Sequence, residues 1–87
     1  MTETHAEIVA ATKAFILAEF LPGEDPDELT EETPLLSGGI LDSISTVRLV
    51  GFLEDSYEIE FQAHEISEDH LDSLKSVAAL VLEKRAE

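Results

Sequence analysis

The apolar residues of this chain recur at steps of three and four in three separate stretches, and this spacing constrains the fold more than any other feature. It places apolar side chains along one face of a helix. Because a short amphipathic helix is stable only when that face is packed, the chain is predicted to be all-α. The predicted helices run from about His5 to Phe20, from Ser43 to about Tyr57, and from a cap at Asp72 or Ser73 to Lys84 and Arg85.

Capping residues mark the ends of the first two predicted helices. Thr4 and Glu7 have the spacing of a capping box at the start of the first helix. Leu21-Pro22-Gly23 ends that helix, and Asp42 is the expected N-cap of the second. The side chains expected to face the core are Ile8, Val9, Ala11, Phe15, Ile16, Ala18 and Phe20 in the first helix, Thr46, Leu49, Val50, Leu53 and Tyr57 in the second, and Leu74, Val77, Ala78, Val81 and either Leu80 or Leu82 in the last.

The segments between these helices differ in character. Pro22 to Asp42 is a long connection with an acidic, solvated first half, where Leu29 is the expected contact with the core. We interpret Glu58–Phe61 as an extended loop and Ile66–Leu71 as a short helical turn or small helix. We therefore expect a small antiparallel four-helix bundle of three main helices and a short third one, with a long loop between the first two. The 87 residues accommodate one domain, expected to cover residues 1–87.

The charge of the chain limits its partners. Twenty acidic residues against five basic ones give a net charge of −15. This charge argues against nucleic acid and anionic membranes as partners, because both are bound through Lys and Arg. It favours basic protein surfaces. No apolar run approaches the roughly 18 residues of a membrane span, and the acidic N-terminus lacks the basic start of a signal peptide. We expect a cytoplasmic protein.

The residue pattern does not favour catalysis or metal binding. A nucleophilic serine needs a base, an oxyanion hole and usually a Gly-x-Ser-x-Gly elbow, whereas Ser43 lies in Leu-Asp-Ser-Ile-Ser. The candidate bases His5, His64 and His70 lie in polar stretches without metal-ligand spacing. The acidic run 24–28 lacks the frame of a calcium loop, and the chain has no cysteine. We expect neither an active site nor a metal site.

Ser43 is instead placed as a site that another enzyme could modify. It follows two glycines and begins a helix, where free amide groups and the helix dipole favour an attached phosphate. Asp42 would cap and orient that helix end. Ile44 and Val47 are apolar on its outward face, next to Arg48 and Gly51. An apolar pair beside a surface serine indicates a partner-binding face formed by these four residues.

The stretch from Leu35 to Val81 resembles the acyl and peptidyl carrier proteins, which bind phosphopantetheine. The motifs that carry the resemblance are Leu-Leu-x-Gly-Gly-Ile-Leu-Asp-Ser-Ile from Leu35, Thr46-Val47-x-Leu49-Val50, Glu54-Asp55, Ile59-x-Phe61, and Leu71-Asp72-Ser73-Leu74-Lys75-Ser76-Val77. The resemblance implies that a phosphopantetheinyl transferase, assisted by magnesium, attaches a 4′-phosphopantetheine arm from coenzyme A to Ser43. The thiol of the arm would hold an acyl or aminoacyl group as a thioester and deliver it to biosynthetic enzymes, which is the use of a tether.

Departures from the family pattern indicate which type of carrier protein to expect. Arg48 and Ser45 stand where acidic residues are common in fatty-acid carriers, and Gly51 adds no side chain to this face of the helix. The chain looks more similar to stand-alone aminoacyl, peptidyl or D-alanyl carriers of specialised pathways. The resemblance implies loading by an adenylating ligase or acyltransferase, and we expect a monomer; acyl and aminoacyl cargo both stay open. The alternatives are an acidic helical interaction module with unmodified Ser43, and a small hydrolase.

Overall fold

The computed structural model of the chain describes residues 4–85. Residues 1–3, part of the acidic N-terminus noted above, lie outside this range. The described residues contain helices and no β-strand, so the all-α prediction is confirmed. The elements are α1 (His5–Phe20), the 3-10 helix η1 (Pro26–Glu28), α2 (Ser43–Tyr57), the 3-10 helix η2 (Ala63–Glu65), α3 (Glu68–Leu71) and α4 (Leu74–Arg85). The helices predicted for His5–Phe20 and Ser43–Tyr57 have the predicted bounds.

The predicted caps account for where the helices begin. The Thr4 hydroxyl accepts a hydrogen bond from the Glu7 amide at 3.1 Å, and the Glu7 carboxylate accepts one from the Thr4 amide at 2.9 Å, which completes the capping box. The Asp42 carboxylate accepts from the Ser45 amide at 2.8 Å. Of the two candidates for the cap of α4, Ser73 accepts from the Ser76 amide at 3.1 Å.

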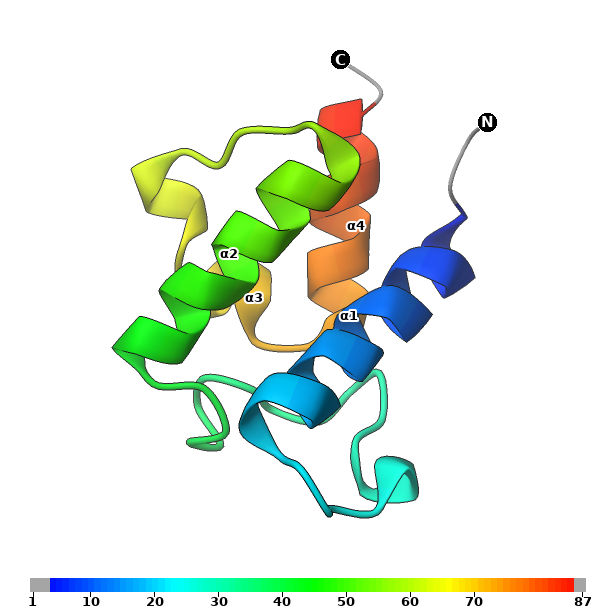
Figure 1. The fold of residues 1–87 in the computed structure, drawn as a ribbon. Helices are drawn as coiled ribbons and strands as arrows, with labels where there is room; N and C mark the ends of the chain where they lie inside the picture. Colours follow the sequence, from blue (N-terminus) through cyan, green and yellow to red (C-terminus); the bar gives the residue numbers. More distant parts are fainter. Residues whose placement is uncertain (1–3, 86–87) are drawn as a thin grey trace.

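The helices pack into a compact body with a radius of gyration of 11.9 Å. α1 packs against α4 and α2, α2 also packs against α4, and α3 packs against α4 and η2. Figure 1 shows that residues 21–42 cross one end of the molecule, next to the C-terminal end of α1 and the N-terminal end of α2. None of the helices in residues 4–85 is long and apolar enough to cross a membrane.

The core contains side chains from every α-helix, and α2 buries the five residues predicted for it. The first helix differs from expectation. Ala18 is exposed, and Thr12, which we did not expect inside, is fully buried between Ile8 and Ile16. Apolar residues occur on almost every side of α1, so spacing alone defines its buried face poorly. In α4 it is Leu80 that is buried, while Leu82 is half-buried.

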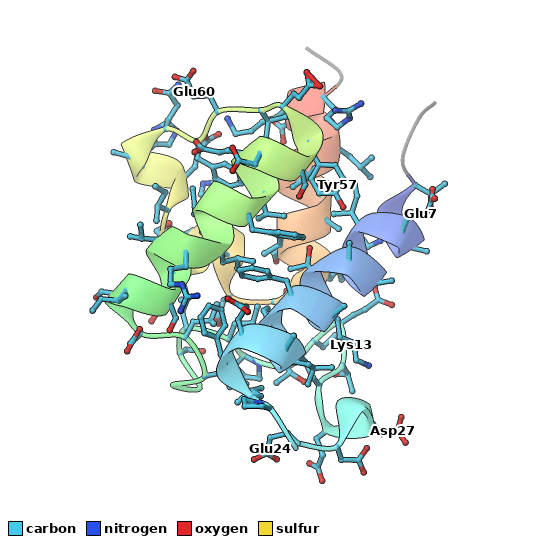
Figure 2. The ribbon with its side chains drawn as sticks, viewed as in Figure 1. Glu7, Lys13, Glu24, Asp27, Tyr57 and Glu60 are labelled. Carbon is cyan, nitrogen blue, oxygen red and sulfur yellow. The ribbon has the colours of Figure 1, made fainter. Side chains whose placement is uncertain are left out.

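The loop between α2 and α3 is held against the C-terminal ends of α2 and α4. The Glu54 carboxylate accepts a hydrogen bond from the Phe61 amide at 2.8 Å. Lys84 forms an ion pair with Glu65 at 2.6 Å, and both side chains are mostly buried. Arg85 donates a hydrogen bond to the Tyr57 carbonyl. Figure 2 shows Glu60 on this loop and, at the opposite end of the molecule, Glu24 and Asp27 pointing away from the helices.

Candidate functional site

The turn that precedes Ser43 is closed by hydrogen bonds and depends on two glycines. The Leu41 amide donates to the Leu35 carbonyl at 2.9 Å, and the Gly39 amide donates to the Leu36 carbonyl at 3.1 Å. A Cβ atom on Gly38 would lie 2.3 Å from the Pro34 carbonyl oxygen. Gly39 has a φ of +80°, a conformation that residues with a side chain rarely adopt. The Gly-Gly pair is therefore required by the shape of this turn.

Asp72 fastens this turn to the junction of α3 and α4. Its Oδ1 accepts hydrogen bonds from the Leu36 amide at 2.7 Å and the Ser37 amide at 2.8 Å. Its Oδ2 accepts from the Ser37 hydroxyl at 2.7 Å, and its carbonyl accepts from the Leu35 amide at 2.6 Å. Asp72, one of the two predicted caps of the last helix, thus bonds instead to residues 35 or more positions earlier in the chain.

These contacts also set the charge state of Asp72. Hydrogen bonds from the Ser37 amide and hydroxyl, and then from the Leu36 amide, hold the pKa of the Asp72 carboxyl below its ordinary value. A lowered folded-state pKa means that the stabilisation is fully present above the ordinary aspartate pKa and is lost as the pH falls through the lower value. At neutral pH the turn is therefore held by a carboxylate that carries its full charge.

Ser43 is the first residue of α2, and its side chain is exposed. Its hydroxyl forms no hydrogen bond with any residue from 4 to 85. The neighbouring Asp42 carboxylate is engaged in the cap, and the hydrogen bond from the Ser45 amide lowers the pKa of that carboxyl. The backbone carbonyl of Asp42 accepts from the Thr46 hydroxyl at 2.7 Å. The structure thus presents a free serine hydroxyl on a well-anchored helix start.

A groove of about 540 Å³ lies beside this hydroxyl. Three parts of the chain line it: the turn, the start of α2, and residues 66–68. Apolar and polar groups share its surface, and no histidine contributes to it. The lining residues are Leu36, Leu41, Asp42, Ser43, Thr46, Val47, Ile66, Ser67 and Glu68. A smaller hollow of about 280 Å³ between α1 and η1 does not include Ser43.

The predicted partner-binding residues lie together on the outward side of α2, but they differ in exposure and in their contacts. Ile44 and Val47 are 73% and 64% exposed. Ile66, which lines the same groove, is 36% exposed. The helical segment predicted for Ile66–Leu71 begins instead at Glu68, so Ile66 precedes α3. The Arg48 guanidinium forms an ion pair with Glu19 at 2.6 Å and lies over the Phe20 ring, so it is held against α1. Ile44, Val47 and Ile66 are called the apolar face below.

Gly51, on the same side of α2, offers a prediction about stability. It is exposed in the helix interior, and nothing lies within 4 Å of a Cβ atom built on it. Replacing Gly51 with alanine should raise the free energy of unfolding by about 0.5–1 kcal/mol, because alanine restricts the unfolded chain and favours the helix. Urea unfolding followed by circular dichroism measures this change. A loss of stability would contradict the open surroundings of Gly51.

The histidines lie apart from Ser43 and its groove. The rings of His64 and His70 are 6.4 Å apart in an edge-to-face arrangement on η2 and α3. Across residues 4–85, no three His, Cys, Asp or Glu side chains come close enough to hold a metal ion. The chemical groups that the structure brings together are the free serine hydroxyl, the helix start, the groove and the apolar face.

Comparison with known proteins adds no assignment. No protein-family model matches the chain, and no curated protein matches it. The function must therefore be inferred from the site itself and from the motifs around it.

Proposed function

We propose that this protein is a carrier that holds an acyl or aminoacyl group as a thioester on a 4′-phosphopantetheine arm attached to Ser43. The observation that supports the proposal most is the exposed Ser43 hydroxyl, free of hydrogen bonds, at the start of α2. This hydroxyl lies inside the Gly-Gly-Ile-Leu-Asp-Ser-Ile motif, which resembles the modification site of carrier proteins. The protein would be a substrate of the enzymes that load it rather than an enzyme.

The surroundings of Ser43 suit a phosphodiester. The Ser43 oxygen would attack the phosphorus of coenzyme A that bears the pantetheine. The new O–P bond would replace the bond to adenosine 3′,5′-bisphosphate, and the serine proton would pass to a base of the transferase, which also supplies the magnesium. The start of α2 offers a positive dipole end to the negative charge of the phosphodiester. The chain's own contribution is to hold the serine exposed on a fixed helix end.

The apolar face suggests where partner proteins would dock. We propose that a phosphopantetheinyl transferase, an adenylating ligase or acyltransferase, and downstream biosynthetic enzymes dock on Ile44 and Val47, next to Ser43. Arg48 and Gly51 would form the edge of this contact, with Arg48 contributing through its pair with Glu19. The proposal includes a cytoplasmic monomer in which the helices form an antiparallel bundle with a long first crossover.

An acidic interaction module with unmodified Ser43 is the second candidate. The exposed acidic residues of the first connection favour it, because a basic protein could bind there by electrostatic attraction. These residues belong to the segment between α1 and α2 and to η1, whereas only Asp42 and Glu68 bring acidic groups to the groove beside Ser43. The two candidates therefore use different surfaces, and modification of Ser43 separates them.

The intact mass of the protein tests the proposal. The wild-type protein would be incubated with coenzyme A, magnesium and a phosphopantetheinyl transferase of broad specificity, and the modified peptide would be located by proteolysis. A gain of one phosphopantetheine on the peptide that contains Ser43 supports the carrier function. A folded protein that gains no mass with several transferases contradicts it and favours the interaction module.

The apolar face yields a prediction about affinity. Ile44→Asp and Val47→Asp should each raise the KM for phosphopantetheine transfer about tenfold, with kcat little changed, because each places a charge in an apolar contact. Steady-state transfer kinetics measure the effect. Ala79→Asp is the matched control, since it adds the same charge at an exposed position of α4. An unchanged KM in both α2 variants would rule out this docking face.

A further inference from the structure

Asp72 connects two of the chain segments that line the groove beside Ser43, the turn and residues 66–68. It directly follows α3, and the residues Ile66, Ser67 and Glu68 that precede and begin this helix line the groove. Its carboxylate binds the amides of Leu36 and Ser37, and Leu36 also lines the groove. Three of the four hydrogen bonds between Asp72 and residues 35–37 are therefore made by one side chain, which belongs to neither the apolar face nor the modified helix.

We propose that Asp72 is a positioning residue for the modification of Ser43, because its carboxylate fixes the turn that leads into α2 and thereby the groove next to the hydroxyl. This inference rests on the proposed carrier function. It assigns to the junction of α3 and α4 a part in the transfer reaction, although Asp72 stands 29 positions after Ser43 in the sequence.

The route from Asp72 to Ser43 consists of short, consecutive contacts. The carboxylate holds residues 36 and 37, and the hydrogen bonds from Gly39 to Leu36 and from Leu41 to Leu35 close the turn onto these held residues. Asp42 comes next, and its side chain caps α2 immediately before Ser43. Without the Asp72 carboxylate, residues 36 and 37 lose three hydrogen bonds, and only the bond from the Leu35 amide to the Asp72 carbonyl still joins the turn to this residue. The turn that positions Ser43 is then held less firmly, while α2 and its Asp42 cap stay formed.

The expected kinetic consequence differs from that of a docking variant. Ile44 and Val47 stay on α2, so the transferase would still bind a variant that lacks the Asp72 contacts. The serine oxygen would be held less well against the phosphorus, and misplacement of a reacting atom by about 1 Å can cost on the order of 10²-fold in rate. Asp72→Ala should therefore lower kcat about tenfold or more while KM changes less than about twofold.

Two further variants should lose less of the transfer rate than Asp72→Ala does. Asp72→Asn keeps an oxygen that can accept from both amides and an amide group that can donate to the Ser37 hydroxyl, so it should recover most of the rate that alanine loses. Ser37→Ala removes one of the three hydrogen bonds to the carboxylate and should cost less than Asp72→Ala. If Asp72→Ala does not fold, the test is whether the kcat of Ser37→Ala is lower than that of the wild type.

A general loss of stability must be separated from positioning. Lys84→Met is the matched control: it breaks the mostly buried ion pair with Glu65, which joins η2 to α4 and lines no part of the groove. Both Lys84→Met and Asp72→Ala should lower the melting temperature, and only Asp72→Ala should lower kcat. Hydrogen exchange adds a readout that needs no transferase, because the amides of Leu36 and Ser37 should exchange faster in Asp72→Ala and not in Lys84→Met.

The experiment measures transfer kinetics and hydrogen exchange for the wild type and these variants at a temperature where all are folded. A kcat loss confined to the Asp72 and Ser37 variants, with faster exchange at Leu36 and Ser37, supports the inference. Equal kcat in wild type and Asp72→Ala, or an equal loss in Lys84→Met, overturns it while the carrier function stands. A wild-type protein that accepts no arm overturns both, and is recognised because the failure occurs before any variant is compared.

Discussion

Ser43→Ala is expected to abolish addition of the phosphopantetheine arm completely and to leave the fold intact. The hydroxyl oxygen is the atom that would form the bond to phosphorus, and alanine offers no substitute. The fold should tolerate the change because the Ser43 side chain is exposed and makes no hydrogen bond with the described residues, while the Asp42 cap uses the Ser45 amide. Alanine also has the highest helix propensity. Intact mass measures the first effect, and thermal unfolding measures the second.

Ser45→Ala is the matched control for this prediction. Ser45 lies in the same first turn of α2. Alanine removes the hydrogen bond of the Ser45 side chain to the Asp42 carboxylate, but the backbone amide continues to donate to Asp42. This variant should accept one arm at a rate close to that of the wild type. Arm addition to Ser43→Ala would show that the modified group lies elsewhere, and loss of addition in Ser45→Ala would show that the transferase requires more than the Ser43 hydroxyl.

The sequence predicts the helices and their ends well because the signals that determine them are local. The capping box at Thr4, the N-cap at Asp42 and the stripe from Thr46 to Tyr57 each depend on residues within one or a few turns. The same is true of the exposure of Ile44 and Val47, which follows from their place opposite the buried side of α2. The position of Ser43 at a helix start could therefore be predicted from the sequence alone.

Contacts between distant parts of the chain could not be predicted in this way. Asp72 and Ser73 are both residue types that cap helices, and only the fold shows that Ser73 caps α4 while Asp72 holds the turn before Ser43. Arg48 was expected to contribute to a partner-binding face, and the fold adds its ion pair with Glu19 on α1. The closeness of Ile66 to Ser43 likewise depends on how the loop after α2 returns. In each case the partner is set by packing and not by the local sequence.

Leu53→Ala is the substitution from which we expect the largest loss of stability. Leu53 lies on the buried side of α2, has no exposed surface, and belongs to the core that joins the helices. Truncating a buried leucine removes apolar contacts and leaves a cavity, at a cost of about 2–5 kcal/mol. A chain of 87 residues has a total free energy of unfolding of about 4–13 kcal/mol, so this one change could remove half of it.

Urea unfolding of Leu53→Ala and Val47→Ala, followed by circular dichroism, measures this difference. Val47 is 64% exposed on the opposite side of the same helix, so its truncation should change the free energy of unfolding by less than about 0.5 kcal/mol. Equal costs for the two variants would contradict the orientation of α2. That orientation is also what places Ile44 and Val47 in solvent beside Ser43, so the stability measurement tests the docking face without any transferase. At a temperature where Leu53→Ala stays folded, it should still accept the arm, because Leu53 lies ten residues along α2 from Ser43.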